Sequence, residues 1–139
     1  MTTTGVRRST TKPRSGLGLW VLYLCDAGLL VASGLIHLHL WDIAYRHVQT
    51  LDVLFLVQVV ACLLAAVALL VTRHLLVVLG AAALMAGTMA GFLLARSVGI
   101  FGFHLTFSSG LAYAVLVVEA AALVMLGLTA ALQLRRRHR

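Results

Sequence analysis

Charged residues are scarce in this chain: 11% of its 139 residues are Asp, Glu, Lys or Arg, and only four are acidic. Ordinary soluble domains carry about 25% charged residues and about 45–50% apolar ones, whereas 62% of this chain is hydrophobic. So few polar groups cannot cover a water-facing surface. The composition therefore excludes an ordinary soluble domain and predicts one small helical bundle in lipid.

Cysteine is also rare, with two residues, Cys25 and Cys62, both inside apolar runs. They do not form a C-x-x-C pair, so the sequence contains neither a thiol-exchange motif nor a zinc-binding pattern. We interpret both as small packing residues within lipid-embedded helices.

The net charge of +7 raises the question of nucleic-acid binding, but its distribution argues against it. Eight of the eleven Lys and Arg lie in the terminal stretches "VRRSTTKPR" and "RRRHR". No basic patch is interleaved with aromatics, so we expect no nucleic-acid partner. Basic tails of this kind are typical of the cytoplasmic side of a membrane protein, where they contact anionic lipid head groups.

Four stretches are long and apolar enough to cross a bilayer, which requires roughly 20 residues. They cover residues about 17–40, 53–71, 75–95 and 110–132, between basic tails at 1–16 and 133–139. With Arg73, nine Lys and Arg lie on the side of the tails, against Arg46 and Arg96 on the other. The positive-inside rule then places both termini in the cytoplasm. The predicted fold is an all-α four-transmembrane-helix bundle.

The first span carries a polar stripe. At 100° per residue, Ser33 and His37 fall within roughly 20° of Asp26 around the helix. Lipid offers these groups no partner, so they are expected to face the interior of the bundle. A charged Asp26 would be costly at that depth, and we expect it to be protonated or paired.

Glu119 in the fourth span is the natural counterpart of Asp26, and the expected spans allow the two carboxyls to lie within one helical turn of depth. One interpretation is a proton- or cation-coupled site built from Asp26, Glu119 and the polar side chains Ser33 and Gln58. The alternative is a pair of neutral carboxyls, each hydrogen-bonded to a neighbour such as Gln58, Tyr23, Ser33 or Thr88.

His37 and His39 form an H-x-H pair, but residues two apart on a helix point about 200° apart and cannot share a metal. A metal or haem site would need His37 together with a second ligand, and His104 in "GIFGFHLTF" is the best candidate. Imidazole ligands suit haem iron or copper. The alternative is an interfacial histidine bonded to an outer loop, and the cofactor stays unknown.

The other polar residues near the outer face are spaced for ion pairing or for anchoring the helices at the lipid head groups. Asp42 and Arg46 are spaced i,i+4, as in a short helix above the membrane. Arg96 ends the third span, where it either extends toward the head groups or pairs with Glu119 or Asp42.

Small residues form two ladders, which permit close helix approach. One runs through Ala83, Gly87 and Gly91, and the other through Gly28 and Ala32. We expect them to serve packing within the bundle or docking to a membrane partner or a second copy.

The stretches "GLIHLHLWDIAYRHVQTLDVLFLVQ" and "ARSVGIFGF" resemble a group of small four-span membrane proteins of actinobacteria. The shared features correspond to His37, Tyr45-Arg46, the run Leu54-Phe55-Leu56, the loop from Gly99 to Phe103, and Glu119. The resemblance implies the four-span fold and no particular activity.

Three functions remain open. The first is an accessory or scaffold subunit of a bacterial cytoplasmic-membrane complex, because the chain is small and shows no complete catalytic constellation. We do not expect it to be an enzyme. The second is a small transporter coupled to ions or protons through Asp26 and Glu119. The third is a haem-, metal- or quinone-binding redox protein with an outer site around His37 and His104.

Overall fold

The computed structural model describes residues 15–45, 51–98 and 110–137, which form four long helices. These are α1 (Ser15–Leu40), continued by the short π-helical turn η1 (Trp41–Tyr45), then α2 (Leu51–Thr72), α3 (Leu75–Ser97) and α4 (Gly110–Arg137). All four are long and apolar enough to cross a membrane. The predicted all-helical class and the four span-length helices are confirmed.

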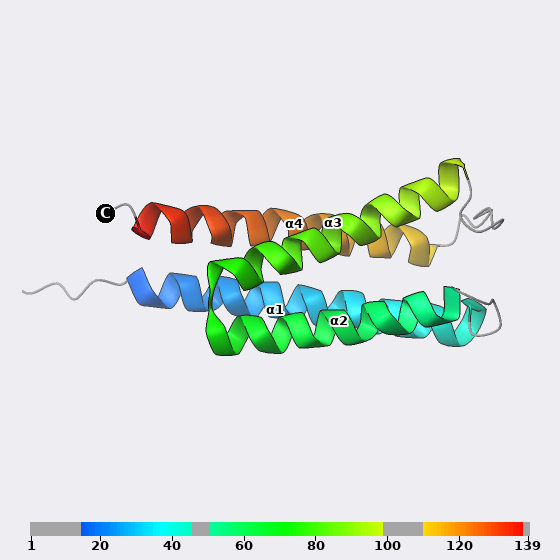
Figure 1. Ribbon diagram of the computed structural model, residues 1–139, viewed down its shortest axis with the longest axis horizontal. Coiled ribbons are helices and arrows are strands. Elements are labelled where there is room, and N and C mark those ends of the chain that lie inside the picture. Colours follow the sequence, from blue (N-terminus) through cyan, green and yellow to red (C-terminus); the bar gives the residue numbers. More distant parts are fainter. Residues whose placement is uncertain (1–14, 46–50, 99–109, 138–139) are drawn as a thin grey trace, which may run out of the picture.

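The helices form an antiparallel bundle, in which α1 packs against α2 and α4, and α3 packs against α4 and α2. The start of α1, the turn between α2 and α3, and the end of α4 lie together at one end of the bundle (Figure 1). We call this the basic end, because Arg73, Arg135, Arg136 and Arg137 belong to it. From this end α3 diverges from α2 toward its own C-terminus (Figure 1).

Each helix is free of proline, since the single proline of the chain, Pro13, precedes α1. The α2–α3 turn is made by Arg73, whose φ of 50° is left-handed and ends α2. Its backbone N–H still donates to the Leu69 carbonyl at 3.1 Å. His74 then caps α3, its Nδ1 accepting from the backbone N–H of Leu76 at 3.4 Å. These two residues therefore allow two long helices to be joined by a very short connection.

The buried residues recur every three or four positions on each helix, the spacing of helices that cross at a small angle. On α2 and α3 they are almost all apolar: Val59, Cys62, Ala66, Leu69, Val78, Ala81 and Met85. Many large apolar side chains on all four helices are exposed instead. The bundle is thus apolar outside as well as inside, and its fully buried polar side chains lie on α1 and α4.

Candidate functional site

The inward face of α1 carries the predicted polar stripe. Asp26 and Ser33 are completely buried and His37 is 6% exposed. Tyr23 and Leu30 complete the same face, which α4 covers with Glu119, Thr129 and Gln133 among its buried residues. The interior of the bundle therefore holds two groups of polar side chains, one toward each end.

His37 and Glu119 form the first polar group. The imidazole Nε2 lies 3.8 Å from Oε1 of Glu119, and both side chains are buried. The other ring nitrogen, Nδ1, lies 2.9 Å from the backbone carbonyl oxygen of Ser33. Phe55 of α2 packs against the imidazole, with the ring centroids 5.5 Å apart and the rings tilted by 50°. Three helices thus fix the position of this histidine.

Glu119 is held without direct hydrogen bonds: within the described part of the chain, neither of its buried carboxyl oxygens has a hydrogen-bond partner. The thiol of Cys62 lies beside Ser33 and close enough to Glu119 to interact with it electrostatically. A buried carboxyl so placed must be neutral or paired with a positive charge, because an isolated charge in an apolar interior is very costly. The ionisable side chain that faces it is His37, whereas Arg96 is exposed.

Gln58 connects α2 to α3 next to this group. Its Nε2 donates to Oγ1 of Thr88 at 2.9 Å and lies 3.4 Å from the sulfur of Cys62. Thr88 in turn donates to the Leu84 carbonyl at 2.6 Å. Gln58 therefore has a structural partner and ties together the two helices that diverge toward this end.

Asp26 belongs to the second polar group, nearer the basic end. Oγ1 of Thr129 donates to its Oδ2 at 2.6 Å. Because Asp26 pairs with Thr129 and His37 with Glu119, eleven residues of α1 separate the levels of the two carboxyls. At 1.5 Å per residue this is roughly 16 Å. Asp26 and Glu119 therefore lie more than one helical turn apart in depth, whereas the expected spans had allowed them to lie within one turn.

The layers between the two carboxyls are mainly apolar, with Leu30 and Leu126 both completely buried there. Beyond Asp26, toward the basic end, Gln133 donates to the hydroxyl of Tyr23 and, at 3.1 Å, to the backbone carbonyl of Arg73. Tyr23 also donates to that carbonyl at 3.4 Å. The α2–α3 turn is thereby bonded to both α1 and α4.

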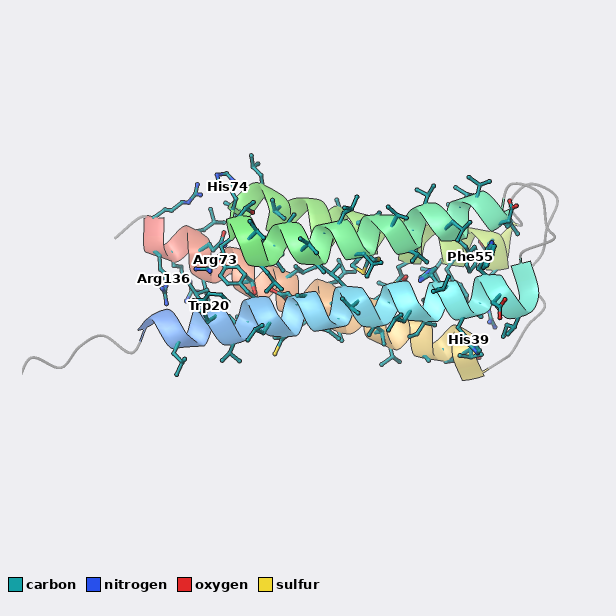
Figure 2. The ribbon with its side chains drawn as sticks, turned by 90° about the horizontal axis from the view of Figure 1, so that it is seen from below. Trp20, His39, Phe55, Arg73, His74 and Arg136 are labelled. Atoms are coloured by element: carbon teal, nitrogen blue, oxygen red, sulfur yellow. The ribbon has the colours of Figure 1, made fainter. Side chains whose placement is uncertain are left out.

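Arg73 also contacts α1 through its side chain. Its Cζ lies 3.8 Å from the centroid of the Trp20 ring, a cation–π contact. Figure 2 shows Trp20, Arg73, His74 and Arg136 together at this end, with His39 and Phe55 at the other.

The remaining predicted polar residues lie apart from the buried groups. The side chains of His39, Asp42 and Arg96 are exposed, the last near the C-terminal end of α3. His104 and Arg46 lie outside the described residues, so the proposed His37–His104 ligand pair and the Asp42–Arg46 pair cannot be placed. Among the residues that the structure describes, no three His, Cys, Asp or Glu side chains gather as metal ligands.

Most residues of the small-residue ladders lie on exposed faces of the described helices. Gly28, Ala83 and Gly87 are exposed, and Ala32 and Gly91 are only half-buried. A Cβ added at Gly28, Gly87 or Gly91 would meet nothing within 4 Å. These three glycines therefore meet no neighbouring helix in the structure, and the docking role that the sequence also allowed stays a prediction.

The close approach occurs at Gly34 instead, which the sequence did not single out. A Cβ there would lie 3.3 Å from Cβ of Cys62 and 3.6 Å from the Val59 carbonyl oxygen. Thr129 and Gln133 were also missed. Their spacing from Glu119, in steps of three and four residues through Ala122 and Leu126, was the available signal.

Comparisons with models of known protein families, with curated proteins and with solved structures find no match for this chain. The fold and the site define an all-helical protein with four helices suited to a membrane and two buried polar groups between α1 and α4. The resemblance to the actinobacterial group remains a hypothesis from the sequence.

Proposed function

We propose that this protein is an accessory or scaffold subunit of a multi-component assembly in the bacterial cytoplasmic membrane, with both termini inside. Four long apolar helices support the membrane location. The basic end supports the orientation, because it gathers Arg73 and the last turn of α4 on the side where α1 begins.

The observation that carries the proposal is the outward face of α3. Gly80, Ala83 and Gly87 are exposed on it, and a Cβ added at either glycine would meet nothing within 4 Å. Small residues at such spacing let another helix approach closely, which favours association in lipid through van der Waals packing. We expect the occupant to be a helix of a membrane partner, with a second copy of this chain as the alternative.

Mild solubilisation from native membranes, followed by size-exclusion chromatography and mass spectrometry, tests the proposal. Gly87→Leu is expected to weaken the association by about tenfold, or about 1.4 kcal/mol. Gly127→Leu on α4 is the matched control, because that glycine is also exposed with open space beyond it. A wild-type chain that elutes alone as a monomer would contradict the accessory role, and equal loss in both variants would contradict docking on α3.

Coupled transport is the second candidate, favoured by the buried acids. Asp26 and Glu119 are completely buried, and each has at least one oxygen without a hydrogen-bond partner in the described structure. Intramembrane carboxyls are costly and often mark ion or proton pathways. The roughly 16 Å between their levels makes them two successive stations rather than one site. Proton or ion flux into proteoliposomes that persists in both Asp26→Asn and Glu119→Gln would reject this role.

A further inference from the structure

The contact between His37 and Ser33 fixes where a proton sits on the imidazole. Nδ1 is 2.9 Å from the Ser33 backbone carbonyl oxygen, and a carbonyl oxygen can only accept. Nδ1 must therefore carry a hydrogen in the neutral as well as the charged imidazole. Any change of protonation takes place at Nε2, the nitrogen that faces Oε1 of Glu119 at 3.8 Å.

We propose that His37 and Glu119 form a binding site for one exchangeable proton, carried either on Nε2 or on the carboxyl group. With the proton on Glu119, both side chains are neutral; with the proton on His37, they form an ion pair. The net charge is zero in both arrangements, so the proton can pass from one group to the other without leaving a net charge in the apolar interior. This site does not depend on the accessory role.

The groups around His37 and Glu119 explain why the pair holds one proton rather than none or two. The described groups near the pair are Ser33 on α1, Cys62 and Gln58 on α2, and Thr88 on α3, which Gln58 reaches. None of these four carries a fixed positive charge, and Arg96 is exposed near the end of α3. An empty pair would leave an uncompensated carboxylate, and a doubly protonated pair an uncompensated imidazolium, both of which are costly in a membrane interior.

The position of the pair indicates from which end the proton is exchanged. His37 lies six residues before Ile43, where the candidate span ends, or roughly 9 Å along the helix. On the other side, the apolar layer of Leu30 and Leu126 separates it from Asp26. The half-buried Phe55 ring packs on the imidazole and comes from the first turns of α2. Exchange therefore takes place past Phe55, at the end opposite the basic end.

The first experiment observes the unsubstituted pair and uses a variant only to assign the signal. Nuclear magnetic resonance of the full chain in micelles, labelled with ¹⁵N-histidine, distinguishes the two neutral tautomers, and His37→Gln assigns the signal. The expected result is a proton on Nδ1 at every pH at which the imidazole is neutral. A neutral His37 with its proton on Nε2 and a bare Nδ1 would overturn the proposal.

The second experiment follows the carboxyl group by infrared difference spectroscopy during a pH titration. A protonated-carboxyl band is expected that is lost in Glu119→Gln and retained in the matched control Asp26→Asn. In His37→Gln its midpoint is expected to move by about one pH unit or more, because the partner within 4–6 Å is gone. Glu119→Gln should also release one proton fewer than the wild type. A Glu119 band that is absent at every pH, or unmoved in His37→Gln, refutes the shared proton.

The route is tested separately by chemical modification of His37 with diethyl pyrocarbonate, localised by tandem mass spectrometry. Phe55→Ala is expected to speed the reaction several-fold, whereas the same truncation on α3, Phe92→Ala, is expected to leave the rate unchanged. Equal rates in the wild type and Phe55→Ala would overturn exchange past Phe55.

Discussion

The close approach of α1 and α2 at Gly34 gives a sharp prediction about how the site is assembled. A Cβ at this position would lie 3.3 Å from Cβ of Cys62, 3.6 Å from the Val59 carbonyl oxygen and 4.0 Å from Val59 Cα. The last two are backbone atoms, which cannot rotate aside. Gly34→Leu adds further carbons beyond this Cβ, so α1 and α2 must move apart.

The size of the effect follows from a comparison with Gly28→Leu on the same helix. Replacing glycine by leucine favours the helix by up to about 1 kcal/mol at either position, so this contribution cancels between the two variants. Overpacking costs about 1–3 kcal/mol and applies only at Gly34, since a Cβ at Gly28 meets nothing within 4 Å. Gly34→Leu is therefore expected to be less stable than Gly28→Leu by about 2 kcal/mol.

The assay is unfolding in mixed micelles with increasing dodecyl sulfate, followed by circular dichroism. Moving α2 away from α1 should also withdraw Phe55 from His37, so Gly34→Leu is expected to speed modification of His37. Surface substitutions usually change the unfolding free energy by less than about 0.5 kcal/mol. If the unfolding free energies of the two leucine variants differ by less than this, α1 and α2 do not approach each other closely at Gly34.

Three further predictions address the second polar group and the helix faces. Thr129→Val is expected to lower the unfolding free energy by about 1–2 kcal/mol, because Asp26 loses its 2.6 Å hydrogen bond; an unchanged value would contradict that bond. Tyr23→Phe should cost about 1 kcal/mol in the same assay, since its hydroxyl donates to the α2–α3 turn. Cys25 is exposed and Cys62 is buried, so Cys25→Ala should abolish labelling by an apolar maleimide. Labelling that depends on Cys62 instead would mean that the helix faces are misplaced.

The sequence was sufficient for the four helices and for the inward face of α1. Continuous apolar runs of about 20 residues have few alternatives to a helix in lipid. Asp26, Ser33 and His37 repeat with the helical period, so a single helix determines that they share a face. Predictions of this kind depend on one segment only, and the structure places all three side chains in the interior.

Features that depend on two helices could not be derived in this way. Whether Asp26 meets Glu119 depends on the register of α1 against α4, and errors of two to four residues at each helix end cover more than one helical turn. Gly28 and Gly34 are equally small, yet only Gly34 faces a neighbour, because the rotation of α1 about its axis is set by all its contacts. Small residues mark where an approach is sterically permitted, not where it occurs.

The polar pairs determine the register of α1 against α4, which the hydropathy pattern alone does not determine. Tyr23 and His37 are fourteen residues apart on α1, and their partners Gln133 and Glu119 are fourteen residues apart on α4. Sliding α4 by one turn would still bury Leu30 against apolar side chains, because leucine and alanine recur along the whole helix. It would, however, separate Asp26 from Thr129 and His37 from Glu119 simultaneously and leave buried polar groups without partners. Each such group costs about 1–3 kcal/mol or more, so the polar residues between α1 and α4 select one register among several that the apolar residues permit.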